Sequence, residues 1–396
     1  MAIILFDDST CQNLLPLTFT RPVADLRIGI LTIAEKWAKY LNQSVSYHTR
    51  PYLQGKFPLQ VGVDNLFING AFCPDEILLE AIAKLSIGQG IKYQDCLVAA
   101  RLNEVDARMF NPEHAFETVN VKHLPVHIRY PEHIFRYNDV ELRKDFNLLT
   151  KGRESAAISA TNTIIGIDFF AEEGAEAECS TFNTNNGPIY LAKNSSVWEG
   201  CHIRGAFALG KNSQVKMGAK IYGATTIGPH SRVGGEISNA VVWGYSNKGH
   251  DGFLGNSVLG EWCNIGADSN NSNLKNNYTD VKLWDYATER YRNTSLQFCG
   301  LIMADHAKCG INTMFNTGTV VGVGANVFGG GFPPNHVPDF TWGGVDGFEE
   351  HKITKMLQTT ERVFARRDGR AFDENEQQIL KKVFELTAPY RDPLTP

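Results

Sequence analysis

Apolar residues recur at every sixth position through the middle of the chain. Eight consecutive members are Leu191, Val197, Ile203, Leu209, Val215, Ile221, Ile227 and Val233. The series resumes at Phe253, Leu259 and Ile265, and again at Met303, Cys309, Phe315, Val321 and Val327. Hexads of this kind predict a parallel β-helix, in which three short strands make one coil and each contributes one apolar side chain to the interior. Alternating strands and amphipathic helices have shorter periods, so neither explains the spacing.

The hexads divide the chain into segments. We expect an α/β domain over residues 1–150, a transition over 151–187, the β-helix over 188–345 and a helical tail over 346–396. The first segment alternates apolar strands with helical patterns, which predicts a parallel sheet. The β-helix should bring Val197, Ile203 and Leu209 into one shared interior. No hexad survives in residues 268–298, which we interpret as an insertion.

The composition limits the kinds of partner that the chain is expected to bind. The net charge of −5 and the isoelectric point near 6.1 give no general electrostatic reason to bind nucleic acid or an anionic membrane. The eight cysteines include no Cys-x-x-Cys pair, which favours a reducing cytoplasm. The chain begins without the basic flank and apolar run of a signal peptide, and no stretch is apolar enough to span a bilayer. We expect a small-molecule substrate and no metal site.

Residues 15–22 (LPLTFTRP) resemble the Pro-Leu-Thr segment of sugar-1-phosphate nucleotidyltransferases. An α/β domain of that kind before a β-helix resembles the family of bifunctional N-acetylglucosamine-1-phosphate uridylyltransferases and glucosamine-1-phosphate acetyltransferases. The resemblance implies a nucleotidyltransferase-like, Rossmann-like domain, a left-handed parallel β-helix of hexapeptide repeats, and C-terminal helices. It also implies Thr18 and Arg21 as candidate nucleotide-binding residues.

The amino-terminal motifs depart from that family. The loop at residues 7–14 (DDSTCQNL) lacks the glycines and the arginine that cradle a triphosphate. Val23 stands where the family has a lysine, and Ala71 stands where it has a magnesium-binding carboxylate. The domain therefore binds a nucleotide sugar without making one, transfers nucleotides through substituted residues such as Arg21, Asp7 and Asp8, or is only structural. Mg²⁺ is expected only if this domain is active.

The motifs of the β-helix match the same family more closely. Residues 247–255 (NKGHDGFLG) resemble its acetyltransferase active site, and His250 falls on the catalytic histidine. Imidazole titrates near neutrality, so it can take the proton of an attacking amine or hydroxyl. The substrate-binding residues implied are Asn247, Lys248, Phe253, Asn273 and Arg232. The residues implied for binding acetyl-coenzyme A, the expected acyl donor, are Ala267, Ala304 and Ile311.

Other positions point to a different acceptor. Phe253 and Leu274 replace family tyrosines, and Gly234 replaces a phosphate-binding arginine, although Arg232 is close by in the sequence. The polar, aromatic-containing insertion could be an active-site loop or a covering flap. In hexapeptide acyltransferases such loops reach a neighbouring subunit, so the resemblance implies a homotrimer with active sites between chains.

Three functions follow from these observations. The first is acyl transfer to a sugar phosphate or nucleotide sugar, with His250 as the general base. The second is sugar-1-phosphate nucleotidyl transfer, with the β-helix as a trimerisation module. The third is a non-catalytic scaffold that binds a nucleotide sugar.

Overall fold

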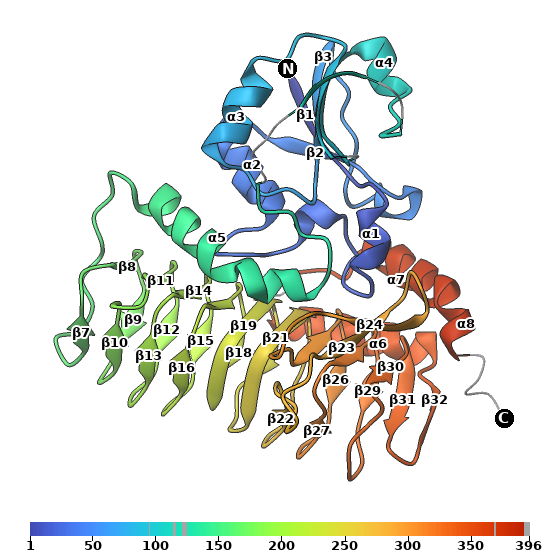
Figure 1. The fold of residues 1–396 in the computed structure, drawn as a ribbon. Coiled ribbons are helices and arrows are strands. Elements are labelled where there is room, and N and C mark those ends of the chain that lie inside the picture. The colour runs from blue at the N-terminus through green and yellow to red at the C-terminus, as the bar shows by residue number, and fades with distance from the viewer. Residues whose placement is uncertain (95, 114–115, 121–124, 368–369, 392–396) are drawn as a thin grey trace. The chain divides into compact units, whose positions relative to one another are not determined.

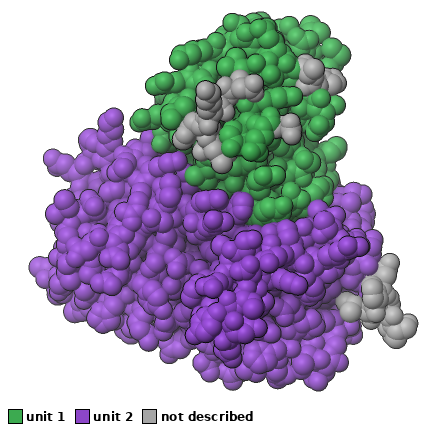
Figure 2. Space-filling view, viewed as in Figure 1, with its two compact units in different colours: residues 1–26, 31–130 green, residues 27–30, 131–396 purple. Residues whose placement is uncertain are grey.

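The computed structural model describes residues 1–94, 96–113, 116–120, 125–367 and 370–391. The chain forms two compact units (Figure 2): unit 1 comprises Met1–Leu26 and Leu31–Tyr130, and unit 2 comprises Arg27–Ile30 and Pro131–Pro396. Unit 1 ends at Tyr130, whereas the sequence predicts the end of the first domain at residue 150. Helix α5 (Glu132–Thr150) accounts for the difference, because its buried Asn138 donates to the backbone oxygen of Ala224 at 3.0 Å within unit 2.

Unit 1 contains a mixed sheet. Its strands, in the order β2-β1-β3-β5-β4-β6, are β1 (Ala2–Phe6), β2 (Val45–His48), β3 (Asp64–Asn69), β4 (Gln89–Tyr93), β5 (Cys96–Asn103) and β6 (Glu117–Asn120). Strands β2, β1 and β3 are parallel to one another, but β5 is antiparallel to both β3 and β4. The prediction of an all-parallel sheet was wrong. β4 ends at Tyr93 and β5 begins at Cys96, which leaves too short a connection for the crossover that parallel pairing needs.

The helices of unit 1 are short. They are α1 (Thr10–Asn13), α2 (Ile33–Leu41), α3 (Glu76–Ala83) and α4 (Glu104–Arg108), with single 3₁₀ turns at Val23–Asp25 and Pro51–Leu53. A capping box fixes the start of α2, where the Thr32 hydroxyl accepts from the Glu35 amide at 3.1 Å and the Glu35 carboxylate accepts from the Thr32 amide at 2.7 Å. This start lets α2 bury Trp37 completely.

Unit 2 is a parallel β-helix whose coils stack along one axis (Figure 1). Face 1 contains β7 (Thr163–Ile165), β10 (Thr181–Asn183), β13 (His202–Arg204), β16 (Lys220–Tyr222) and the first parts of β19 (Glu236–Gly244) and β21 (Phe253–Glu261), and it continues through β22 (Asn270–Asn271) and β27 (Met314–Phe315). Face 2 contains β8 (Phe169–Ala171), β11 (Ile189–Leu191), β14 (Phe207–Leu209), β17 (Thr225–Ile227), the second parts of β19 and β21, β25 (Leu301–Met303), β28 (Thr319–Val321) and β30 (His336–Val337). Face 3 contains β9 (Glu176–Ala177), β12 (Ser196–Val197), β15 (Gln214–Val215), β18 (Arg232–Val233), β20 (Asn247–Lys248), β26 (Lys308–Cys309), β29 (Asn326–Val327), β31 (Thr341–Gly344) and the antiparallel β32 (Gly347–Glu350).

The hexad residues fill the interior of the β-helix. Val197, Ile203 and Leu209 belong to one core and are each at most 2% exposed, so the predicted shared interior is confirmed. One assignment was wrong, because Leu254 and not Phe253 joins the core. The coil before Leu254 is shortened, because Val233 pairs with Lys248, only fifteen positions later. Counting six residues at a time from Val233 therefore no longer gives the interior positions.

The β-helix begins earlier than the sequence predicts. Strand β7 pairs with β10, which places the first coil at Thr163 and not at residue 188. Ala171, Ala177 and Phe182 supply the interior of this region. The residues expected to form a transition therefore include the first coil. It has no hexad signal because small alanines take the place of branched aliphatic residues.

The insertion folds onto its own chain. Strands β23 (Lys282–Asp285) and β24 (Arg290–Asn293) form an antiparallel hairpin. The Tyr286 hydroxyl donates to the Asp339 carboxylate at 2.9 Å, and Arg292 forms an ion pair with Glu132 at 2.7 Å. These buried contacts favour a covering flap over a free active-site loop.

The carboxyl-terminal helices are α6 (Ile353–Arg367), α7 (Glu374–Leu386) and α8 (Ala388–Arg391). Helix α6 packs against the β-helix through Phe364, whose ring centroid lies 3.9 Å from that of Trp262. Among the described residues, no helix has the length and apolar character needed to cross a membrane. All eight cysteines are free thiols.

Substituting an interior residue should cost far more stability than substituting an exposed one. Ile227 is fully buried, so Ile227→Ala should lower the free energy of unfolding by about 2–5 kcal/mol. Ile167 is 93% exposed, so Ile167→Ala should change the free energy of unfolding by less than about 0.5 kcal/mol. Urea denaturation measures both. Equal effects would contradict the placement of the hexads.

Candidate functional site

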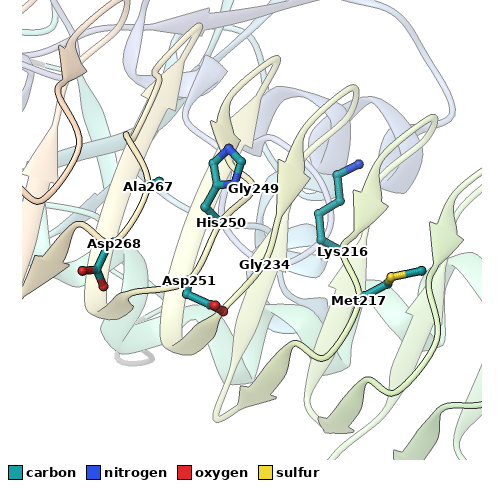
Figure 3. Close-up of a pocket in the computed structure, with 9 residues that line it drawn as sticks. Lys216, Met217, Gly234, Gly249, His250, Asp251, Ala267 and Asp268 are labelled. Atoms are coloured by element: carbon teal, nitrogen blue, oxygen red, sulfur yellow. The ribbon is translucent and has the colours of Figure 1, made fainter.

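A cavity of about 460 Å³ opens at the corner that follows face 3. Its lining residues come from successive coils and are Lys216, Met217, Gly234, Gly235, Gly249, His250, Asp251, Ala267 and Asp268 (Figure 3). Four of the nine are glycine or alanine, so the backbone itself forms much of the wall. His250 lines the cavity together with the ionisable side chains of Lys216, Asp251 and Asp268.

His250 presents its imidazole to the cavity. Its side chain is exposed, and no described residue makes a hydrogen bond to the ring. Figure 3 shows the ring extending to the same side as the Lys216 side chain, whereas the carboxylates of Asp251 and Asp268 point away from it. Both ring nitrogens are therefore open to a ligand. The sequence-predicted base lies where a reacting group could approach it.

Lys216 brings positive charge to the cavity. Its ammonium donates to the Gln214 side chain at 2.5 Å and lies 3.8 Å from the centroid of the Trp198 ring. Burial and the neighbouring Arg232 lower the pKa of Lys216. Sequence analysis missed this residue because it lies two coils before His250, and only the stacking of coils brings the two together.

Glycines allow the coils to approach one another at this corner. Gly235 has φ of +73°, and a Cβ there would lie 2.8 Å from the Gly252 oxygen. Gly252 has φ of +112°, and a Cβ there would lie 2.2 Å from the Ser269 oxygen. Larger residues would push adjacent coils apart, because both the conformation and the space exclude a side chain. The glycines therefore set the depth of the cavity beside His250.

Lys248 does not lie in the cavity. It occupies the interior register of face 3, where Val233 precedes it, and it is 3% exposed. Its ammonium donates to the backbone oxygen of His250 at 2.6 Å. Burial lowers its pKa to about 8, against a weaker opposing influence from Asp251. In the structure Lys248 holds the backbone of His250 from inside, and direct binding of substrate by Lys248 stays a prediction.

The other predicted substrate residues lie in different places. Arg232 is exposed on face 3, and the half-buried Asn247 beside it donates to Asn264 at 3.3 Å. Phe253 and Asn273 are half-buried on the other side of the His250 turn, and the Asn273 amide donates to Asn256 at 2.8 Å. None of these four lines the cavity. Arg232 and Asn247 nonetheless lie on β18 and β20, the two strands that end just before the cavity-lining Gly234 and Gly249.

The residues predicted to bind the acyl donor also lie in different places. Ala267 lines the cavity. Ile311 is 71% exposed at the same corner, one coil further on. The backbone N–H of the next residue, Asn312, donates to the backbone oxygen of Ala267 at 2.8 Å. Ala304 is completely buried in the core. Its side chain cannot contact a donor, because it faces the interior and not the surface.

The two nucleotide-binding candidates of unit 1 are buried. Thr18 is fully buried and donates to the backbone oxygen of Cys11 at 2.7 Å. Arg21 is 4% exposed and forms an ion pair with Asp25 at 3.0 Å. Both side chains stabilise the loop that follows β1. Contact of Thr18 and Arg21 with a nucleotide stays a prediction.

A different polar cluster lies at the carboxyl ends of β1 and β3. Asp8 accepts from the Asn69 amide at 2.7 Å and from the Cys96 thiol at 3.4 Å, while Asp7 accepts from the hydroxyl of Thr49 at 2.5 Å. Burial raises the pKa of Asp7. Ligands of open α/β sheets bind at such strand ends. The part of the chain that the structure describes contains no group of three or more His, Cys, Asp or Glu residues that could hold a metal ion.

The amino-terminal part of the chain matches a known family model. Residues 3–154 match the family model described as sugar nucleotidyl transferase, which covers less than half of the chain. This matched segment includes α5, although α5 packs within unit 2. No curated protein matches the chain significantly.

Solved structures similar to the chain include sugar acyltransferases. A UDP-N-acetylglucosamine acyltransferase from Campylobacter jejuni is 11% identical with a TM-score of 0.25, covering 59% of this chain and 83% of its own. The Arabidopsis UDP-N-acetylglucosamine acyltransferase is 15% identical with a TM-score of 0.25, covering 59% and 82%. A hexapeptide transferase family protein from Anaplasma phagocytophilum is 15% identical with a TM-score of 0.19, covering 58% and 95%. These scores are too low to support an assignment of function.

The buried Lys248 should make stability depend on pH. Its folded pKa of about 8 lies below the unfolded value of 10.5, so between these values the unfolded chain holds a proton that the folded chain lacks. The free energy of unfolding should therefore rise with pH in this window, by about 1.4 kcal/mol per unit at most. Urea denaturation from pH 7 to pH 10 would show this slope in the wild type and not in Lys248→Met.

The exposed Lys211 provides the matched control, and Lys211→Met should keep the wild-type slope. A Lys248→Met protein with an unchanged slope would show that the ammonium is not buried in the interior.

Proposed function

We propose that this chain, whose residues 3–154 match the sugar nucleotidyl transferase family, transfers an acyl group to an amino or hydroxyl group of a sugar phosphate or nucleotide sugar. The observation that carries the proposal is the cavity at the corner of the β-helix with the unpartnered His250 ring inside it. Acetyl-coenzyme A is the proposed donor. The match of unit 1 to a family that handles activated sugars supports the choice of acceptor class.

Acyl transfer in this cavity uses His250 as a general base. One imidazole nitrogen accepts the proton of the acceptor amine or hydroxyl as its nitrogen or oxygen bonds to the thioester carbonyl carbon. The tetrahedral intermediate then collapses with cleavage of the carbon–sulfur bond. The imidazolium returns the proton to the leaving thiolate, so the reaction consumes no external acid or base. The hydrogen bond from Lys248 to the His250 backbone holds the turn that carries the ring.

Charges around His250 suit an anionic substrate. Lys216 lies on the same side of the cavity as the imidazole, and Asp251 and Asp268 point away (Figure 3). An ammonium on this side of the cavity favours the binding of a phosphate group. A phosphorylated acceptor would therefore be held close to the proposed base.

The corner also fits a thioester donor. Ala267 on the cavity wall and the exposed Ile311 on the next coil form a small apolar surface on which an acyl chain could lie. Ala304 is excluded from this role by its burial.

We further propose that the protein works as a homotrimer in the cytoplasm. The eight free thiols support a reducing compartment, and light scattering would measure the trimer mass.

Replacing the proposed base tests the reaction. His250→Ala should lower the kcat of acyl transfer about a hundredfold or more, the contribution expected of a positioned base. The side chain is exposed, so the melting temperature should stay close to that of the wild type. A panel of sugar phosphates and nucleotide sugars with acetyl-coenzyme A, followed by thiol release, provides the assay.

His202 on β13 is also exposed and provides a control, because His202→Ala should leave acyl transfer unchanged. Full activity in His250→Ala would remove this residue from catalysis. A collapse of the fold in His250→Ala would show that the imidazole is structural.

A second candidate function is sugar-1-phosphate nucleotidyl transfer, which the family match of residues 3–154 favours. Thr18 and Arg21 are committed to internal contacts, and no described cluster suits a magnesium ion. We therefore expect little or no pyrophosphate release from any common nucleoside triphosphate with a panel of sugar-1-phosphates. Robust magnesium-dependent release would make nucleotidyl transfer the leading function. Failure of both assays would favour a non-catalytic scaffold.

A further inference from the structure

Strand β7 leaves one edge of the first coil open. It pairs with β10 on one side, and no described strand lies on its other side. The N–H of Thr163 donates to the Ser180 oxygen at 2.9 Å, and the Ile165 oxygen accepts from the Thr184 N–H at 2.7 Å. Successive residues of a strand direct their backbone groups to opposite sides, so Ile164 directs its N–H and C=O away from the β-helix. Figure 1 shows β7 at the end of the stack of coils.

The other two faces of the first coil are covered by the chain that precedes β7. On face 2, the Ala156 N–H donates to the backbone oxygen of Ala171 in β8 at 2.8 Å. On face 3, the Asn162 side chain donates to the backbone oxygen of Ala177 in β9 at 2.7 Å. The outer edges of β8 and β9 therefore have hydrogen-bond partners within the chain. Of the three strands in the first coil, β7 alone presents an uncovered edge in the part of the chain that the structure describes.

The uncovered edge is apolar and uncharged. Ile164 is aligned with the core residue Phe182, yet it is 43% exposed because no described coil lies beyond it. Ile165 is 40% exposed on the outer side of face 1. Residues 155–167 contain no charged residue and no proline. Charges, prolines and bulges are the usual protection of an unpaired strand edge, so the composition of this edge favours pairing with another strand.

The last coil of the β-helix is closed. The Phe384 ring of α7 packs on Phe340 with 5.2 Å between centroids, and Arg391 of α8 donates to the backbone oxygen of Asp339 at 3.4 Å. On face 3, the antiparallel β32 pairs with β31. The open end of one copy therefore cannot stack on the opposite end of another. Contact between two copies through the open end must join identical ends, which requires a two-fold axis.

We propose that the open end of the first coil binds the same end of a second copy of this chain. Strand β7 pairs with its counterpart in antiparallel orientation, with Ile164 at the two-fold axis. The Ile164 residues of the two copies then exchange both of their N–H···O bonds, and Thr163 of each copy faces Ile165 of the other. The apolar edge is removed from water, and its lack of charge allows two identical surfaces to meet without repulsion.

This contact is independent of the proposed acyl transfer and of the proposed homotrimer. It doubles whatever assembly the other surfaces form, so a trimer becomes a hexamer and a single chain becomes a dimer. The ratio of two masses therefore tests the contact in either case.

Light scattering on the full-length protein measures the doubling. Combining Thr163→Asp with Ile165→Asp places carboxylates directly opposite each other across the axis, so the double variant should have half the mass of the wild type. Thr181 and Asn183 occupy the same two positions on β10, which has a strand on both sides. Thr181→Asp with Asn183→Asp should therefore keep the wild-type mass. Thr163 and Ile165 are exposed, so the melting temperature should confirm that the first variant is folded.

A cysteine at the axis tests the geometry of pairing. The two Cα atoms of a hydrogen-bonded antiparallel pair lie about 5.5 Å apart, a separation that a disulfide spans. In a Cys179→Ser background, which removes an exposed thiol, Ile164→Cys should form a covalent dimer on mild oxidation. Val345→Cys, at the exposed turn between β31 and β32, should not.

Two results would overturn the proposal. The first is equal mass for the wild type and the folded Thr163→Asp/Ile165→Asp variant, which would show that the open end joins no second copy. The second is the absence of a covalent dimer in Ile164→Cys, or an equal yield in Val345→Cys, which would show that β7 does not pair with its counterpart.

Discussion

Every coil of the β-helix must place a side chain from each face into one narrow shared interior. Branched aliphatic residues meet this requirement in most coils, with Val197, Val215 and Val233 following one another on face 3. The next interior position is Lys248, an ionisable residue in a row of hydrophobic ones. Burying its amine costs stability unless a polar partner is present, and the His250 backbone oxygen is that partner. The interior thus fixes the turn that presents the imidazole.

Packing of the coils also decides what surrounds His250. Residues from four coils meet at one corner because Gly235 and Gly252 allow their backbones to approach closely. The same stacking aligns the outward residues of face 3. Residues 3–154 of the same chain match the family model described as sugar nucleotidyl transferase.

The sequence predicted the features that depend on a local period. The hexads located the β-helix and its interior correctly from residue 191 to residue 233, and the motif around His250 located an exposed histidine in a cavity. Features that depend on the stacking of distant residues were missed. Lys248 lies inside because the shortened coil shifts the register. The burial of Thr18 was not predictable, because a motif gives residue order and not burial.

The most direct measurement is a crystal structure of the full chain with coenzyme A and a phosphorylated or nucleotide-linked sugar. The proposed mechanism predicts that both ligands meet at the cavity beside His250, with the acceptor nitrogen or oxygen about 3 Å from an imidazole nitrogen. It also predicts the coenzyme sulfur on the side of Ala267. Ligands bound away from this corner, or an imidazole turned from the acceptor, would contradict the central claim that the β-helix carries an acyl-transfer site.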